Sequence, residues 1–227
     1  MEAQTEVIGD CTLYCGDCLR IAPLLAGVDA VVADPPYGIG VKTDSRDRSR
    51  RPLKGTSTTA RAFPPIIGDD RPFDPTPWLS YPSVVLWGGN HYADALPPSA
   101  KWLVWDKRRE TTPDDNADCE MAWTNLRGVA RIYRHLWRGI CREGEENIAK
   151  GGAKLHPAQK PVALMAFCVR QLPASARVIL DPYMGSGSTG VACLRLGFRF
   201  VGIEIDPHYF GVACRRLKEE YENLGKT

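Results

Sequence analysis

Residues 178–206 read VILDPYMGSGSTGVACLRLGFRFVGIEID and hold an apolar run, a glycine-rich turn, a helical stretch and a second apolar run. The first run ends at Asp181, and apolar residues then recur at helical spacing, which is typical of a strand followed by a helix. The second run ends in acids at Glu204 and Asp206. Strand, helix and strand form one βαβ unit. The stretch therefore predicts an α/β sheet whose glycine turn lies at the carboxyl edge, where such sheets bind ligands.

The glycine turn also indicates the chemistry of the ligand. Gly185 and Gly187 permit a tight turn and a close approach of a ligand to the backbone. Ser188 and Thr189 suit the first turn of the following helix, whose N–H groups attract anions. The turn lacks the Gly-Lys-Ser/Thr of a P-loop, and Asp181 would repel a phosphate but attract an ammonium. These features favour a ligand with an amino-acid moiety.

Glu204 follows the turn by about twenty residues, where dinucleotide-binding folds hold ribose hydroxyls. Ammonium, carboxylate and ribose together describe S-adenosylmethionine better than NAD. The competing interpretation is that the glycines only shape the turn and that Glu204 is a solvated strand end.

The rest of the chain extends the same pattern. Residues 12–34 predict strand, helix and strand, and further strands are predicted at 83–90 and 101–107. Residues 119–125 and 129–137 are predicted to form a hairpin. Residues 40–80 and 138–155 lack regular periodicity. A length of 227 residues suits a single domain, here 1–227, with these irregular segments inserted in it.

Composition excludes several classes of protein. The formal net charge is +2, too small by itself to prove a polyanionic partner. The N-terminus does not resemble a signal peptide, and no apolar run approaches 18 residues, which favours a cytoplasmic protein without membrane contact. The eight cysteines are then expected to be reduced. Cys11, Cys15 and Cys18 lack the second ligand pair of a structural zinc site.

A second motif stands at residues 31–37, VVADPPY, where an apolar strand stops at Asp34. Proline cannot donate to a sheet ladder, so Pro35 and Pro36 end the strand and make the bend rigid. The acid and the ring of Tyr37 are thereby fixed at a strand end.

Three motifs together resemble DNA amino-methyltransferases. DPPY at 34–37 resembles the catalytic motif of that family, DPYMGSGSTG at 181–190 resembles its cofactor motif, and HPAQKP at 156–161 resembles the motif before the cofactor strand. Phenylalanine is more usual at the position of Tyr183. The order, catalytic motif first and cofactor motif last, resembles the circularly permuted beta-class of small bacterial or phage enzymes. This resemblance implies a Rossmann-like, S-adenosylmethionine-dependent methyltransferase fold with helices on both faces of a mostly parallel sheet.

The resemblance also implies roles for particular residues. The catalytic residues would be Asp34, Pro35, Pro36 and Tyr37: the Asp34 carboxylate and the Pro35 carbonyl accept N–H bonds from the target amine, and Tyr37 stacks on a flipped base. Asp17 would contact the adenine of the cofactor, and His156 and Lys160 would lie near the cofactor without taking part in the chemistry. No metal is required. The expected cofactor-binding residues are Asp17, His156, Lys160, Asp181, Pro182, Tyr183, Gly185, Gly187, Ser188, Thr189 and Glu204.

Basic residues near the catalytic motif predict contact with double-stranded DNA. The candidates are Lys42, Arg46, Arg48, Arg50, Arg51, Lys54, Lys107, Arg108 and Arg109. Residues 107–150 are the expected target-recognition region. A homodimer and a separate restriction endonuclease are partners that the resemblance suggests.

Asp34, the first residue of the tetrapeptide DPPY, bears on the choice of target base. By resemblance, aspartate fits adenine-N6 methylation, whereas serine is common for cytosine-N4. Cytosine-N4 methylation stays an alternative, and a catalytically silent DNA-binding module is a third interpretation.

Overall fold

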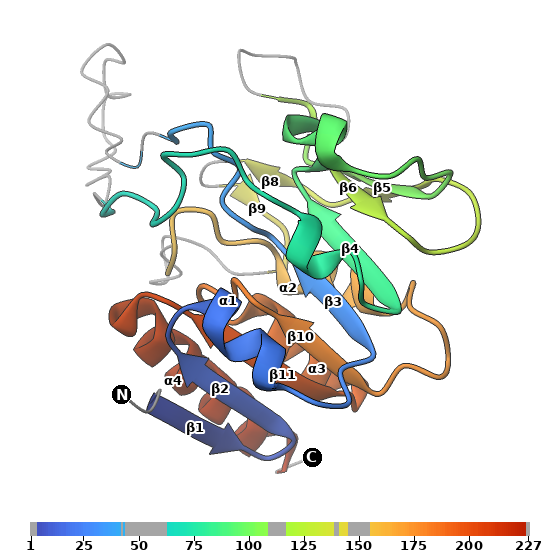
Figure 1. The fold of residues 1–227 in the computed structure, drawn as a ribbon. Coiled ribbons are helices and arrows are strands. Elements are labelled where there is room, and N and C mark those ends of the chain that lie inside the picture. Colours follow the sequence, from blue (N-terminus) through green and yellow to red (C-terminus); the bar gives the residue numbers. More distant parts are fainter. Residues whose placement is uncertain are drawn as a thin grey trace.

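A computed structural model describes residues 4–41, 43, 63–108, 117–138, 141–144 and 155–225. A sheet of nine strands, in the order β1-β2-β11-β10-β3-β4-β6-β5-β7, runs through the molecule (Figure 1). Strands β1 and β6 run opposite to the others, so the sheet is mostly parallel, as predicted. The strands are β1 (Gln4–Ile8), β2 (Cys11–Cys15), β3 (Ala30–Ala33), β4 (Ser83–Trp87), β5 (Trp102–Asp106), β6 (Cys119–Thr124), β7 (Arg131–Arg134), β10 (Val178–Asp181) and β11 (Arg199–Glu204).

Helices cover both faces of the sheet. α2 (Val162–Val169), α3 (Ser188–Leu196) and α4 (Pro207–Leu224) share one apolar core with the sheet, and they lie together behind it in Figure 1. The short α1 (Cys18–Ile21) and the 3₁₀ turns η1 (Ala22–Leu24) and η2 (Thr76–Trp78) cover the opposite face. The remaining elements are the 3₁₀ turns η3 (Gly89–His91) and η4 (Ala93–Ala95) and the small antiparallel pair β8 (Trp137–Arg138) and β9 (Cys141–Arg142). No helix of the described part is long and apolar enough to cross a membrane.

Burial on both faces explains the continuous apolar runs of the central strands. In β3, Ala30 and Val32 belong to the core under α2–α4, whereas Val31 and Ala33 belong to the core under α1 and η2. Successive side chains of a strand point to opposite faces, so a strand covered on both faces needs an apolar residue at every position.

The two motif-bearing strands are neighbours in the sheet. β10 pairs in parallel with β3, with Ile179 opposite Ala30 and Leu180 opposite Val31, although about 150 residues separate them in the chain. Both strands therefore end at the same edge of the sheet. The DPPY turn and the glycine turn follow those ends directly.

Two expectations from the sequence were wrong in detail, and one strand was missed. The predicted hairpin does not form, because β5 lies between β6 and β7 and pairs with both. The helix expected within residues 12–34, in the stretch CLRIAPLLAG at 18–27, is shorter and continues as a 3₁₀ turn around Pro23, since proline lacks the N–H that an α-helix would need there. Strand β1 was not anticipated.

Candidate active site

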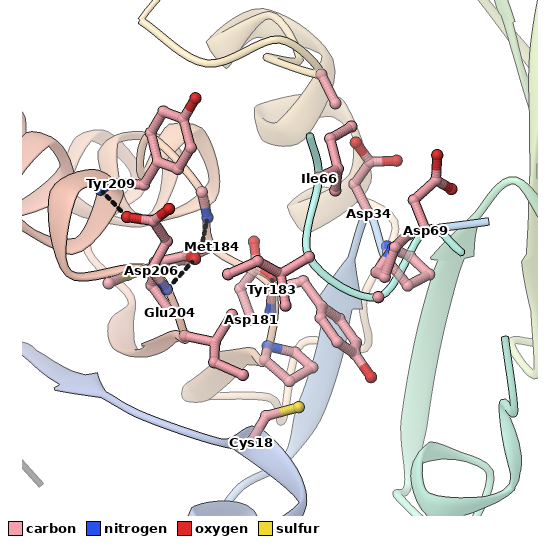
Figure 2. A pocket seen from close by; sticks show the side chains of 18 of the residues that line it. Cys18, Asp34, Ile66, Asp69, Asp181, Tyr183, Met184, Glu204, Asp206 and Tyr209 are labelled. Atoms are coloured by element: carbon pink, nitrogen blue, oxygen red, sulfur yellow. Dashed lines mark hydrogen bonds between the residues drawn. The ribbon is translucent and has the colours of Figure 1, made fainter. Parts of the chain in front are cut away.

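A cavity of about 480 Å³ opens at the carboxyl ends of β2, β3, β10 and β11. Each of these strands supplies an acid at or just beyond its end: Asp17, Asp34, Asp181 and Glu204 respectively. Figure 2 shows Asp34 on one side of this pocket and Glu204 and Asp206 on the other. The structure thus brings the two predicted motifs to one cavity.

Most of the predicted catalytic and cofactor residues line this cavity. Gly187 stands outside the lining and instead shapes the entry to α3: its φ is +79°, and a Cβ there would lie 2.7 Å from Leu217 Cδ1. The predicted residues in the lining are Asp17, Asp34, Pro35, Pro36, Tyr37, His156, Lys160, Asp181, Pro182, Tyr183, Gly185, Ser188, Thr189 and Glu204.

Asp34 is held by two donors. The Tyr37 hydroxyl donates to Asp34 Oδ1 at 2.6 Å, and Lys160 Nζ donates to Asp34 Oδ2 at 2.6 Å. The Tyr37 ring stacks on His91, with centroids 5.0 Å apart, and lies so close to Gly88 that a Cβ there would be 2.1 Å from Tyr37 Cε1. Tyr37 therefore orients Asp34, the acid of the same DPPY motif. The stacking of Tyr37 on a base stays a prediction.

Lys160 lies closer to the DPPY turn than the sequence suggested. Besides Asp34, its ammonium contacts Glu120 Oε2 at 3.1 Å, and Lys107 Nζ donates to the other oxygen of Glu120 at 2.9 Å. Glu120 on β6 was missed. The available signal was an acid within the apolar strand CEMAWT, whose neighbours Ala122 and Trp123 are buried.

The pKa values in this cluster follow from burial and from the alternation of charges. Burial raises the pKa of the Asp34 carboxyl, and the Lys160 ammonium opposes that rise. Burial alone would lower the pKa of Lys160, but Asp34 and Glu120 raise it. Burial would likewise raise the pKa of Glu120, but Lys160 and Lys107 lower it to about 2. Lys160 therefore remains an ammonium and Glu120 a carboxylate at neutral pH.

Asp69 fixes the chain that follows the tetrapeptide. Its Oδ1 accepts from the N–H groups of Gly38 at 2.9 Å and Ile39 at 3.2 Å, and its Oδ2 accepts from Val41 at 2.6 Å. Asp69 is buried, with 5% of its surface exposed. It lies in the segment that looked irregular from sequence, where an acid in the proline-rich stretch PPIIGDDRPFDP carries no periodic signal.

Asp181 is buried beneath the glycine turn. Its Oδ1 accepts from Tyr183 N at 3.0 Å and its Oδ2 from the Thr189 hydroxyl at 2.5 Å. Burial raises the pKa of Asp181 to about 7, although both hydrogen bonds oppose the rise. The Tyr183 hydroxyl, absent from the more usual phenylalanine, accepts from Trp78 Nε1 at 3.2 Å.

Glu204 ties its strand to the glycine turn. Its Oε2 accepts from Gly185 N at 2.9 Å and its Oε1 from Asp206 N at 2.8 Å, and burial raises its pKa. Two hydrogen bonds leave a carboxylate with further acceptor capacity for ligand hydroxyls. Asp206 caps α4 by accepting from His208 N at 2.7 Å.

The HPAQKP segment packs on the cofactor turn. The Ser188 hydroxyl donates to the Lys160 carbonyl at 2.8 Å, and the His156 ring meets Tyr209 edge-on at 4.3 Å between centroids. Lys160 thus has its backbone on the glycine turn and its ammonium on the DPPY turn. Asp17 caps α1 through Leu19 N at 2.9 Å and also lines the cavity, so capping is compatible with the expected contact to the adenine.

Only two of the predicted DNA-binding residues lie in the described part. Lys107 pairs with Glu120, and Arg108 pairs with Asp118 at 2.9 Å while only 5% of its side chain is exposed. Both are therefore engaged within the protein. Lys42, Arg46, Arg48, Arg50, Arg51, Lys54 and Arg109 lie outside the described residues.

Solved structures share this fold. M1.HpyAVI in complex with SAM superposes with a TM-score of 0.51 at 20% identity, covering 91% of this chain and 99% of that one. PvuII DNA methyltransferase, described as cytosine-N4-specific, gives a TM-score of 0.55 at 13% identity, with 96% and 93% covered. At these identities the likeness shows the Rossmann-like fold of S-adenosylmethionine-dependent DNA methyltransferases.

Sequence comparisons identify the family. The type II methyltransferase M2.DpnII of Streptococcus pneumoniae is 43% identical over 89 residues, which are 39% of this chain and 32% of that protein. "Putative methylase YubD" of Escherichia coli (strain K12) is 26% identical over 215 residues, or 89% and 88% of the two chains. The family model N6_N4_Mtase, described as DNA methylase, matches residues 91–215, more than half of the chain. The chain belongs to this N6/N4 DNA methylase family.

Proposed function

We propose that this protein transfers a methyl group from S-adenosylmethionine to the N6 amine of adenine in double-stranded DNA. The observation that carries the proposal is the shared cavity, where Asp34 from β3 faces Asp181 and Glu204 from β10 and β11. A donor bound at β10–β11 and a base held at Asp34 would then meet in one space.

The cofactor half of the cavity fits S-adenosylmethionine by its donors and acceptors. Asp181 supplies a carboxylate for the ammonium, and the first turn of α3 supplies N–H groups for the carboxylate. Glu204 accepts from the ribose hydroxyls and Asp17 from the adenine amino group. Bound there, the cofactor supplies an activated methyl group on a sulfonium.

Asp34 and Pro35 would position the target amine. The lone pair of an exocyclic amine is delocalised into its ring, which makes the amine a poor nucleophile. Two acceptors held rigidly at the strand end bind its two N–H groups, direct the lone pair at the methyl group and stabilise the positive charge that grows on nitrogen. A base inside a duplex cannot reach this depth, so the target nucleotide must leave the stack.

We place adenine before cytosine as the target base because the DPPY motif begins with aspartate, which by resemblance fits adenine-N6 methylation. Cytosine-N4 is the second candidate, and a binding module without turnover is the third. The catalytic strand β3 precedes the cofactor strand β10 in the chain, which supports a circularly permuted, beta-class arrangement. A solitary enzyme or dimer and a modification enzyme paired with a separate endonuclease are both compatible with this arrangement.

Product analysis tests this proposal. Purified protein is incubated with unmethylated genomic DNA and S-adenosylmethionine carrying a deuterated methyl group, and the DNA is digested to nucleosides for mass spectrometry. Labelled N6-methyldeoxyadenosine is expected. Labelled N4-methyldeoxycytidine would establish the second candidate, and cofactor binding without any labelled nucleoside would favour the third.

A further inference from the structure

We propose that Lys160 occupies the position of the target amine on Asp34 until the base arrives, and that its ammonium then moves to Glu120. The proposal rests on the function proposed above. It makes Lys160 and Glu120 positioning residues for the acid of the tetrapeptide. It also explains why a buried lysine stands between two carboxylates that belong to different strands.

The first support is that Lys160 makes the contact that an amine would make. Its Nζ donates to Asp34 Oδ2 at 2.6 Å and lies 3.3 Å from the Tyr37 hydroxyl. With Tyr37 on Oδ1, both oxygens of Asp34 are engaged. A base amine that takes the place of the ammonium on Oδ2 would displace it from that oxygen.

The second support is that an acceptor is available beside Lys160. Glu120 Oε2 is buried and receives no well-formed hydrogen bond from the described residues, yet Lys160 Nζ lies only 3.1 Å away. Lys107 already holds the other oxygen, Oε1, at 2.9 Å. The ammonium can therefore pass from Asp34 to Glu120 by a small side-chain movement and remain paired throughout.

The third support is that the backbone of Lys160 is anchored on a different part of the site from its ammonium. The Ser188 hydroxyl donates to the Lys160 carbonyl, and Arg216 Nη1 donates to the same hydroxyl at 2.9 Å. The segment is thereby anchored on the glycine turn. A buried ammonium without a counterion is strongly unfavourable, so Glu120 is what makes the exchange accessible.

The charge of Lys160 should also keep Asp34 ionised. Burial raises the pKa of Asp34, and the other ionisable groups that act on it are mostly acids, so removal of the ammonium would raise that pKa further. Asp34 and Glu120 would then titrate as a coupled pair. Among the described residues, the ionisable groups that interact with Asp34 are Tyr37, Tyr92, Glu120, Lys160, Cys168 and Asp181.

The test compares Lys160→Met, Lys160→Arg and Glu120→Gln in the full-length protein. The pKa of Asp34 is followed by ¹³C NMR of aspartate-labelled protein, assigned with Asp34→Asn, and kcat and KM for DNA are measured from pH 5.5 to 9. In Lys160→Met, the pKa of Asp34 and the acid limb of the pH profile of kcat should both move up by about one pH unit or more. Lys160→Arg keeps the positive charge, so both quantities should stay near their wild-type values. Glu120→Gln should leave the acid limb at or below its wild-type position but raise KM for DNA about tenfold, because the ammonium loses its alternative partner.

Control variants separate this effect from misfolding. Lys218→Met removes an exposed ion pair with Glu6 and should change none of these quantities. If Lys160→Met does not fold, Lys160→Met combined with Glu120→Gln removes the unbalanced charge, and its Asp34 titration should still lie above that of the wild type. An unchanged Asp34 titration in a folded Lys160→Met variant would overturn the proposal. Absence of methylation by the wild type would instead overturn the proposed function, because the NMR measurement does not depend on turnover.

Discussion

The acids at the strand ends differ because their surroundings differ. Asp34 is bound by an ammonium and a phenol, whereas Asp181 is bound by a hydroxyl and one N–H and forms no ion pair with the described residues. Burial therefore raises the pKa of Asp181 to about 7, which places its titration near neutrality. A ligand ammonium would supply the positive charge that this side of the cavity lacks.

Binding of S-adenosylhomocysteine should depend on pH through Asp181. Because the pKa of Asp181 is raised to about 7, the group is mostly a carboxylate at pH 8 and mostly neutral at pH 6. Its attraction for an ammonium is lost as pH falls, so the Kd should increase about tenfold from pH 8 to pH 6. Calorimetric titration measures this change. Asp181→Asn should bind more weakly with a flatter profile, and an equally steep profile in that variant would assign the titration to another group.

At the level of elements, a single residue, Asp69, fixes the loop that follows the DPPY motif. Asp69 joins the segment 38–41, directly after the tetrapeptide, to the segment that approaches η2. Both segments border the cavity, so the Asp69 carboxylate sets the shape of the wall beside the DPPY turn.

Asp69→Ala should therefore lower kcat and leave cofactor affinity unchanged. Three backbone N–H groups lose their acceptor, and displacement of the DPPY turn by about 1 Å would reduce kcat on the order of a hundredfold. Steady-state kinetics and a cofactor titration measure the two effects. The exposed neighbour Asp70 provides the matched control as Asp70→Ala, and a full rate in Asp69→Ala would show that this wall does not position Asp34.

Asp29 joins the amino ends of β3 and β10, at the opposite edge of the sheet from the cavity. Asp29, just before β3, accepts from Arg177 N at 2.8 Å and Val178 N at 2.9 Å at the start of β10. These two hydrogen bonds lower the pKa of Asp29. The side chain fastens the central strands far from the cavity.

Asp29→Ala should reduce the free energy of unfolding by about 1 kcal/mol without changing kcat. Because the pKa of Asp29 is lowered, its contribution is present above the ordinary aspartate pKa and is lost as pH falls through the lowered value. Urea denaturation at pH 7 should show the difference, and the difference should shrink below about pH 4. A large loss of activity instead would mean that the strand register controls the cavity.

Local patterns predicted some elements and not others. The unit β10–α3–β11 was predictable because its period changes from strand to helix and back within thirty residues. β6 was misplaced because its partners β4 and β5 are chosen by the sheet as a whole, and the local sequence matches a hairpin equally well. The contact between Lys160 and Asp34 could not be predicted from either motif, since the residues lie 126 positions apart and meet only through the pairing of β3 with β10.

At the scale of the molecule, one parallel sheet explains how distant motifs act together. The carboxyl ends of adjacent parallel strands must lie at one edge, so chain order can vary while the site is kept. The N-terminal half of the chain brings Asp34 to the cavity, and the C-terminal half brings Asp181 and Glu204 to the same cavity. Mutations in the C-terminal half should therefore weaken binding of the donor, and mutations at Asp34 should slow the transfer of its methyl group.

The most direct measurement compares Asp34→Asn with Glu204→Ala for cofactor affinity and for transfer of a labelled methyl group to DNA. Asp34→Asn should bind S-adenosylmethionine as the wild type does but transfer at least about a hundredfold more slowly, since its neutral amide no longer stabilises the positive charge that grows on the nitrogen. Glu204→Ala should lose cofactor affinity, and saturating cofactor should restore part of the rate. Full transfer by folded Asp34→Asn, or wild-type affinity in Glu204→Ala, would contradict the division of the cavity into a base site and a donor site.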